Sequence, residues 1–226
     1  MRVPAPGWQD GGVTQVWTVV VPVKRLDAAK SRLRGALPGR PHEALALALA
    51  VDTVEAVRAC SVVAEVLVVT DDQAVAAATG AAGARVVPDR PAAGLNPAFR
   101  YGAAVAGDGW VAGLTADLPA LRPVELAAAL SAARSGPTNR RYVPDAPGTG
   151  TVLLAAPPGM PLDPRFGGNS AAAHAASGAL PLLGDWPSLR RDVDTAADLA
   201  AATRLGLGAH TAPLCGTTTP TASRPV

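Results

Sequence analysis

Short apolar runs alternate with longer segments of helical periodicity along the first half of the chain. The apolar runs are rich in β-branched residues and lack polar alternation, which is typical of strands buried on both faces of a sheet. We predict strands at Trp17–Val23, Ala64–Thr70, Ala84–Asp89 and Gly109–Thr115. Helices are expected between and after them, at His42–Ala59, Asp72–Thr79, Pro97–Ala106 and Pro123–Arg134. Strands that alternate with helices need crossover connections, so the pattern predicts a mostly parallel sheet flanked by helices.

The second half of the chain is less regular. Strands are expected at Arg140–Val143, Thr151–Ala155 and Leu189–Val193, and helices at Ala171–Ser177 and Ala196–Arg204. No repeat or linker divides the chain, so we predict a single α/β domain with a mixed, mostly parallel sheet over residues 16–210. Residues 1–15 and 211–226 are rich in Gly, Pro, Thr and Ser without periodicity, and both ends are predicted to be disordered.

Composition narrows the class of protein. The chain has 226 residues, 49% of them hydrophobic, which is enough to bury a core without disulfide or metal support. A net charge of +2 gives no broad basic field, so neither nucleic acid nor a membrane surface is an expected partner. Two isolated cysteines exclude a disulfide framework, and no secretory signal is visible, so we expect a cytoplasmic protein. The oligomeric state stays open.

The loop after the first predicted strand is a candidate site, because open α/β sheets bind ligands at the carboxyl ends of their strands. It carries five basic residues: Lys24, Arg25, Lys30, Arg32 and Arg34. Such a local excess of positive charge suits a phosphate-bearing ligand, and a solvated surface loop is the alternative. Neither the Walker glycine motif nor the dinucleotide-binding motif is present, which disfavours both of those nucleotide-binding classes.

Three aspartates form a second candidate site. Asp117 lies just past a predicted strand, and Asp192 and Asp194 stand two apart on another, where they would project from one face. Like charges on one face repel unless a cation neutralises them, and carboxylate oxygen is a preferred ligand of Mg²⁺. The pattern predicts a site for one or two Mg²⁺ ions. Turn or helix-cap roles remain the alternative for Asp117 and Asp194.

The glycine-rich segment Pro164–Ala175 is a third candidate site. Gly167 lets the backbone approach a ligand closely, and Ser170 opens a predicted helix whose free amide groups favour phosphate or carboxylate. The turn Gly148–Thr151 precedes a strand and offers further hydroxyl and amide donors, a plain turn being the alternative. His174, within an alanine-rich run, is typical of a packed or surface histidine rather than of a catalyst.

Taken together, these segments resemble one family over Trp17–Leu207. They are P-V-K-x-x-x-x-A-K-S-R-L, G-L-N, A-D-L-P-A-L, G-T before an apolar strand, R-F-G-x-x-S with a following His, and D-V-D-T. The family is the guanylyltransferases of deazaflavin coenzyme F-420 biosynthesis, which act on phosphoenolpyruvate or 2-phospho-L-lactate. The resemblance implies a nucleotidyltransferase sheet of the glycosyltransferase-A-like type, with GTP as a substrate and Mg²⁺ as the cofactor.

The resemblance also implies roles for individual residues. Those similar to the catalytic, metal-holding aspartates are Asp117, Asp192 and Asp194. Those similar to the phosphoenolpyruvate-binding residues are Thr151, Gly167 and Ser170. Those similar to the GTP-binding residues are Lys24, Lys30, Arg32, Gly94 and Asn96.

The implied reaction is attack by the phosphate of phosphoenolpyruvate on the α-phosphorus of GTP, which gives enolpyruvyl-diphosphoguanosine and pyrophosphate. A phosphate nucleophile is already ionised at neutral pH, so catalysis reduces to holding two anions in line and neutralising their charge. Three alternatives stay open. They are the same reaction on 2-phospho-L-lactate or 3-phosphoglycerate, another nucleotidyltransferase such as a molybdopterin guanylyltransferase, and a non-catalytic nucleotide-binding module.

Overall fold

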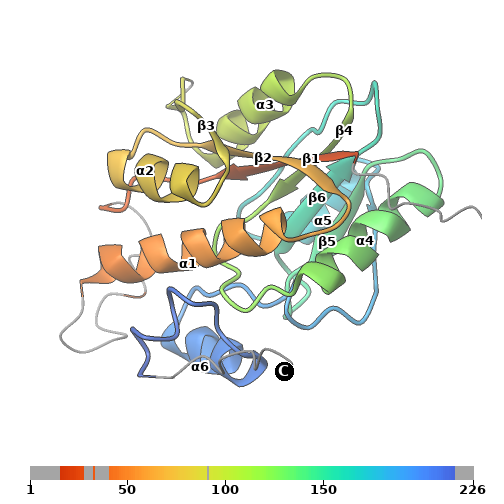
Figure 1. Cartoon of the computed structure of the whole chain (residues 1–226). Helices are drawn as coiled ribbons and strands as arrows, with labels where there is room; N and C mark the ends of the chain where they lie inside the picture. Colours follow the sequence, from red (N-terminus) through yellow and green to blue (C-terminus); the bar gives the residue numbers. More distant parts are fainter. Residues whose placement is uncertain (1–15, 28–32, 34–40, 91, 217–226) are drawn as a thin grey trace, which may run out of the picture.

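The computed structural model describes residues 16–27, 33, 41–90 and 92–216, and these form one seven-stranded sheet with helices on both faces (Figure 1). The strand order is β3-β2-β1-β4-β6-β5-β7. The strands are β1 (Trp17–Pro22), β2 (Val63–Val69), β3 (Arg85–Val87), β4 (Trp110–Leu114), β5 (Arg141–Pro144), β6 (Thr151–Ala156) and β7 (Leu180–Pro181). β6 runs antiparallel to its neighbours β4 and β5, and the other pairs are parallel. The predicted mixed, mostly parallel sheet is therefore confirmed.

Helices cover both faces of this sheet. They are α1 (His42–Arg58), α2 (Gln73–Ala81), α3 (Leu95–Ala106), α4 (Pro123–Ser135), α5 (Ser170–Ala176) and α6 (Ala196–Leu205). Val19 and Val21 of β1 pack in one cluster with α1 and α4, whereas Val20 packs with Phe99 of α3 on the other face. Successive strand residues face opposite layers, and both layers are apolar. The sequence of β1 is therefore apolar without interruption by charged residues.

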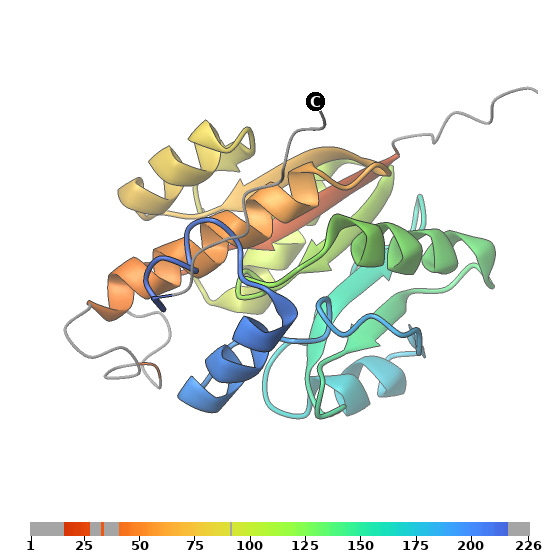
Figure 2. The same cartoon turned by 60° about the horizontal axis from the view of Figure 1, so that its bottom comes forward.

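A third layer lies outside α1, where α6 and the C-terminal turn pack against it (Figure 2). Leu199 and Leu207 form a cluster there with Leu45 and Leu49 of α1. The predicted domain boundary at residue 210 falls inside this layer, because Thr211 is fully buried. The folded part of the chain thus continues to at least residue 216. The predicted disordered ends, 1–15 and the last residues from 217 on, lie outside the described residues.

Most predicted elements match the structure to within two residues. Helix α3 begins at Leu95 rather than at Pro97, and the proline falls in the first turn, where its missing N–H costs no helical hydrogen bond. The strand predicted at Leu189–Val193 is wrong, because the chain there is a turn followed by irregular backbone. On this side β5 pairs with the two-residue β7 at Arg141–Tyr142, and the predicted strand instead contacts the end of β5 through the Arg190 side chain.

Among the described residues, no helix is both long and apolar enough to cross a membrane.

Candidate functional site

The three predicted aspartates lie on two loops that meet at the carboxyl edge of the sheet. The main-chain N–H of Val193 donates to the carbonyl oxygen of Asp117 at 3.0 Å, which sets the loop after β4 beside the segment of the other two. Val193 is fully buried, whereas Asp192 is half-buried and Asp194 is exposed. The two aspartates therefore flank a core residue and lie on its solvent side. The structure brings their two loops together through this main-chain contact and not through the strand that the sequence predicted.

The loop of Asp117 is fixed from α1 by a buried threonine. The Thr53 hydroxyl accepts the main-chain N–H of Leu118 at 2.9 Å and donates to the carbonyl of Leu49 at 2.8 Å. Thr53 is fully buried, so it is inaccessible to water that would compete for these bonds. Sequence reasoning missed this residue, although a polar residue in the middle of an apolar helix was a visible signal.

The segment of Asp192 is fixed by two side chains that the sequence analysis also missed. Glu125 of α4 accepts both N–H groups of Ser188–Leu189, at 2.8 and 3.2 Å. The Arg190 guanidinium donates to both carbonyls of Pro144–Asp145 at the end of β5, at 3.1 and 2.9 Å. These bonds replace the sheet ladder that a strand would have supplied, and they hold the backbone that leads into Asp192.

The donor set at this edge fits a hard divalent cation. Asp117, Asp192 and Asp194 offer only carboxylate oxygens, and Mg²⁺ commonly takes one or two carboxylates and completes its shell with water and phosphate oxygens. The structure does not gather the three carboxylates within 4.8 Å of one another; among the described residues, the group that meets this distance is Asp52, Glu55 and His210. There the Asp52 oxygens accept the N–H groups of His210 and Thr211 at 2.9 and 2.8 Å, which tie the C-terminal turn to α1.

The predicted nucleotide loop leaves the same edge of the sheet. Because β1 and β4 are parallel neighbours, the loop that carries Lys24 begins beside the loop that carries Asp117. Lys24 is exposed. Lys30 and Arg32, the other two basic residues of this prediction, lie outside the described residues.

Asp72, which the sequence analysis did not single out, fixes the start of the nucleotide loop. One carboxylate oxygen accepts the N–H of Leu26 at 3.0 Å, and the other caps α2 through Ala74 and Val75 at 2.9 and 3.2 Å. Burial would raise the pKa of Asp72, but these N–H groups and the charge of Arg25 lower it instead. Asp72 therefore stays ionised and keeps the loop anchored to the end of β2.

In the predicted nucleotide turn, Gly94 is exposed and Asn96 is hydrogen-bonded within the protein. Gly94 is exposed at the start of α3 with a φ of +103°, and a β carbon there would meet no atom within 4 Å. The Asn96 amide, in contrast, donates to the carbonyl of Phe166 at 2.9 Å and accepts the Phe166 N–H at 2.7 Å. Asn96 thus connects the nucleotide turn to the third candidate segment. The two residues are 70 positions apart, so periodicity carries no signal of this pairing.

Thr151 is the first residue of β6 and is buried. The N–H of Thr115 donates to the carbonyl of Val152 at 3.0 Å, so the start of β6 lies beside the loop of Asp117. The third candidate segment and the aspartates consequently adjoin at one corner of the sheet edge.

Gly167 and Ser170 lie on the other side of this corner. Gly167 has a φ of +142° and open space where a β carbon would stand. Ser170 is buried at the first position of α5, and the N–H of the next residue, Ala171, donates to the carbonyl of Thr149 at 3.0 Å. The start of α5 is thereby fixed to the hairpin that carries Thr151.

His174 is packed, as the sequence favoured, but it also contacts one predicted site residue, Thr151, and the main chain of the third candidate segment. Its Nδ1 lies 3.0 Å from the Thr151 hydroxyl, and its Nε2 accepts the N–H of Arg165 at 2.9 Å. The ring is fully buried, and burial is the main cause that lowers its pKa to about 4. The nearby carboxylate of Asp163 works in the opposite direction without overcoming burial. His174 is therefore neutral at physiological pH.

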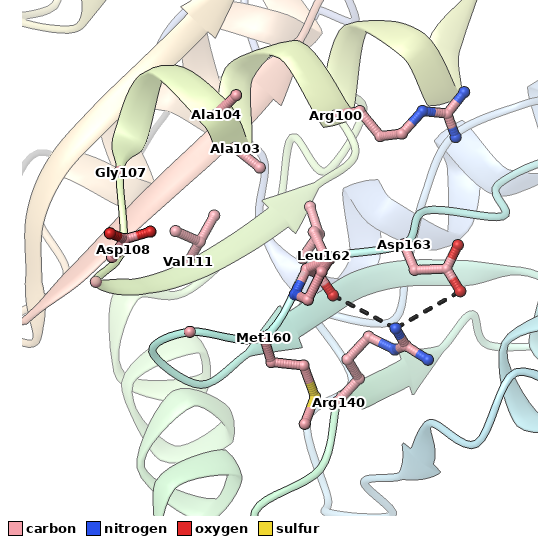
Figure 3. Close-up of a pocket in the computed structure, with 13 residues that line it drawn as sticks. Arg100, Ala103, Ala104, Gly107, Asp108, Val111, Arg140, Met160, Leu162 and Asp163 are labelled. Carbon is pink, nitrogen blue, oxygen red and sulfur yellow. Dashed lines mark hydrogen bonds and ion pairs between the residues drawn. The ribbon is translucent and has the colours of Figure 1, made fainter.

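A separate hollow of about 630 Å³ opens at the opposite edge of the sheet, between α3, the start of β4 and the loop after β6 (Figure 3). Arg140 lies there 3.6 Å from Asp163 and donates to the carbonyl of Pro161 at 3.4 Å. None of the predicted site residues is among the described residues that line this hollow. The candidate site is therefore the loop edge and not this hollow.

Comparisons with known proteins agree with this architecture. The MobA-like NTP transferase domain matches residues 46–165. The phosphoenolpyruvate guanylyltransferase of Salinispora arenicola is 83% identical over 214 residues, which cover 95% of this chain and 100% of that protein.

Two solved structures share the fold. One, described as a nucleotide-diphospho-sugar transferase of Desulfovibrio desulfuricans, has a TM-score of 0.64 at 15% identity, and the match covers 88% of this chain and 94% of that one. The other is the glucosyl-3-phosphoglycerate synthase of Mycobacterium tuberculosis, solved with Mg²⁺ and uridine diphosphate. Its TM-score is 0.52 at 14% identity, over 96% of this chain and 86% of that one. The nucleotidyltransferase type of fold is thus confirmed.

Proposed function

This chain belongs to the family of phosphoenolpyruvate guanylyltransferases, and from that premise we propose that it transfers GMP from GTP to the phosphate of phosphoenolpyruvate. The products are enolpyruvyl-diphosphoguanosine and pyrophosphate, and the reaction is a step of coenzyme F-420 biosynthesis. The chain is an enzyme of the nucleotidyltransferase class.

The observation that carries this proposal is the meeting of two kinds of loop at one corner. The loop of Asp117 lies beside the segment of Asp194 on one side and beside the start of β6 on the other. A transfer between two phosphate groups needs a cation between them and an anion pocket next to it. The three carboxylates would hold the cation, and the corner of Thr151, Gly167 and Ser170 would form the anion pocket.

In this reaction an oxygen of the acceptor phosphate forms a bond to the α-phosphorus of GTP. The bond from that phosphorus to the oxygen that bridges the α- and β-phosphates breaks, and pyrophosphate leaves with the bonding electrons. The attacking oxygen is already ionised at neutral pH, so no side chain has to remove a proton. The protein contributes by holding the two anions in line and excluding other geometries.

The aspartates would hold the cation. Asp117, Asp192 and Asp194 provide the carboxylate oxygens, and the bonds from Thr53 and Val193 keep their two loops together. When bound, Mg²⁺ neutralises charge on the reacting phosphates. The fold relative from Mycobacterium tuberculosis, solved with Mg²⁺ and a nucleotide, supports this assignment.

The remaining residues divide between acceptor and nucleotide. Thr151, Gly167 and Ser170 would bind the acceptor, with hydroxyl groups and an unobstructed backbone at Gly167. Lys24 would face the triphosphate, and Lys30 and Arg32 of the same loop are proposed to do so as well. The open turn at Gly94 is the proposed nucleotide contact, because the Asn96 amide is already bonded to Phe166.

The decisive experiment is an assay of the purified protein with GTP, Mg²⁺ and each acceptor in turn, with the nucleotide product identified by mass. We expect a product with the mass of enolpyruvyl-diphosphoguanosine and an equal amount of pyrophosphate. Reactions with 2-phospho-L-lactate and 3-phosphoglycerate decide the acceptor, and reactions with ATP and CTP decide the base. Formation of no nucleotide diester with any of the three acceptors would contradict the proposal.

A further inference from the structure

The buried His174 of α5 lies in what we call the acceptor corner, formed by Thr151, Gly167 and Ser170. Both of its ring nitrogens have hydrogen-bond partners there. Nε2 accepts the main-chain N–H of Arg165 at 2.9 Å, and Nδ1 lies 3.0 Å from Thr151 Oγ1. The ring packs edge-on against Phe166, with centroids 5.2 Å apart, and lies 5.9 Å from the Tyr142 ring. His174 thus touches both walls of the corner, the β6 start on one side and the glycine-rich segment on the other.

These contacts fix the tautomer of His174. A main-chain N–H can only donate, so Nε2 must offer a lone pair and carries no hydrogen. In a neutral ring the single N–H then lies on Nδ1, 3.0 Å from the Thr151 hydroxyl oxygen, and it also faces the main-chain carbonyl of Ser170. The charged groups near the ring are Asp163, Arg165 and Arg140, and burial outweighs them in keeping the ring uncharged.

The tautomer in turn fixes what Thr151 can offer. A threonine hydroxyl has one hydrogen and two acceptor lone pairs. Because His174 donates to one lone pair, the hydroxyl hydrogen does not point to the ring and is available for donation elsewhere. An anionic acceptor accepts hydrogen bonds but donates none, so it requires the hydroxyl in this state.

We propose that His174 is a positioning residue of the acceptor corner: its Nδ1–H holds Thr151 as a hydrogen-bond donor, and its Nε2 holds the segment of Arg165 and Gly167 opposite. This inference rests on the proposed function, since it assumes that the acceptor binds at Thr151. It adds a residue to the proposed reaction and gives a role to a histidine that is fully buried between β6 and the glycine-rich segment. The imidazole itself takes no proton during the transfer.

The first test reads the tautomer in the unmodified enzyme. Long-range ¹H–¹⁵N correlation spectra distinguish a protonated ring nitrogen from one with a lone pair, and the chain has only three histidines to assign. A His174→Gln spectrum identifies the signal. We expect the Nδ1–H form at pH 7. An Nε2–H form, or a doubly protonated ring, would overturn the proposal whether or not the enzyme uses the proposed acceptor.

The second test is a double-mutant cycle on the Michaelis constants. Thr151→Val and His174→Gln should each raise the acceptor KM about 10–100-fold, the range for a lost hydrogen bond to a charged group. GTP KM should stay within about twofold. The double variant should be at most about threefold worse than the worse single variant, because His174 acts through Thr151.

A matched control separates positioning from packing. In His174→Asn the side-chain amide nitrogen stands near the place of Nδ1 and can still donate to Thr151, so this variant should recover most of the acceptor affinity lost in His174→Gln. Multiplying effects in the double variant, or equal losses in the Asn and Gln variants, would overturn the proposal. Wild-type protein that shows the expected tautomer but makes no product would instead count against the proposed function alone.

Discussion

The two halves of the candidate site are held in different ways. In the acceptor corner, buried side chains bond across the fold, as His174 does to Thr151 and Asn96 does to Phe166. At the aspartate edge, formed by the loops of Asp117, Asp192 and Asp194, main-chain contacts and supporting side chains such as Thr53 hold the loops. The carboxylate of Asp194 is exposed. A change in the acceptor corner should therefore alter stability and binding together, whereas a change at the aspartate edge should alter chemistry alone.

The largest expected effect lies at the aspartate edge. Asp117→Asn and Asp192→Asn each remove a charge from the proposed cation site, and kcat should fall on the order of 1,000-fold. The midpoint of thermal unfolding should stay within a few degrees of the wild type, because main-chain contacts and the side chains of Thr53, Glu125 and Arg190 hold the two loops. Steady-state rates and calorimetric scans measure the two quantities.

The matched control for these variants is Asp108→Asn, an exposed aspartate at the opposite edge of the sheet, which should leave kcat unchanged. Excess EDTA should abolish turnover and added Mg²⁺ should restore it. Unfolding of the aspartate variants, or turnover that persists in EDTA, would contradict the expectation that the aspartate edge affects chemistry alone.

Because of His174, the acceptor corner should make the free energy of unfolding depend on pH. The pKa of His174 is about 4 in the folded protein, against 6.5 for an unperturbed histidine, so the unfolded chain binds more protons between these values. The stabilisation is complete above pH 6.5 and is lost as the pH falls towards 4, by up to about 3 kcal/mol. Asp163, Arg165, Arg140 and Tyr142 are the other ionisable groups near the ring.

Urea unfolding of the wild type and of His174→Gln from pH 7.5 to 4.5 measures this term. Carboxylates titrate alike in both proteins. The difference between the free energies of unfolding of the wild type and of His174→Gln therefore reports the contribution of the histidine. That difference should shrink as the pH falls. A constant difference over the whole range would show that His174 has an ordinary pKa.

The smallest of these effects is expected at Asn96. Asn96→Ala removes two hydrogen bonds to the Phe166 main chain, which should cost about 2 kcal/mol of stability and raise the acceptor KM about tenfold. Asn96→Asp retains the oxygen that accepts the Phe166 N–H but places a second carboxylate oxygen against the Phe166 carbonyl, so it should not restore the lost stability. Urea unfolding and KM values for both substrates test this. A rise in GTP KM alone would return Asn96 to the nucleotide site that the family resemblance implied.

The sequence predicted the parallel half of the fold well because its strands are buried on both faces and carry unbroken apolar runs, as β1 and β2 do. It failed at residues 189–193, where alternation resembles a strand but Glu125 and Arg190 hold the backbone in a turn. It also gave no sign of β7, because two residues carry no periodicity.

In the candidate site, too, only the features with a local sequence pattern could be predicted. Asp117 and Lys24 were visible as candidates because their charges stand out just after apolar runs, and the roles assigned to them stay predictions. The pairing of Asn96 with Phe166 spans 70 residues and that of Thr151 with His174 spans 23, and no local pattern encodes such contacts. Thr53 could have been noticed as a polar residue inside an apolar helix, but its partner Leu118 could not.

The bond between Asp52 and the C-terminal turn has a consequence for the order in which the protein is built. Asp52 is only 4% exposed in the fold, yet its partner His210 lies 158 residues further along the chain. A ribosome that adds about 5–20 residues per second needs about 8–30 s to make that stretch. Until His210 and Thr211 are made, the Asp52 carboxylate lacks the two N–H donors that it has in the fold, so this side of α1 must stay hydrated on the nascent chain. The layer formed by α6 and the C-terminal turn, which closes over α1, is therefore the last part of the molecule to be completed.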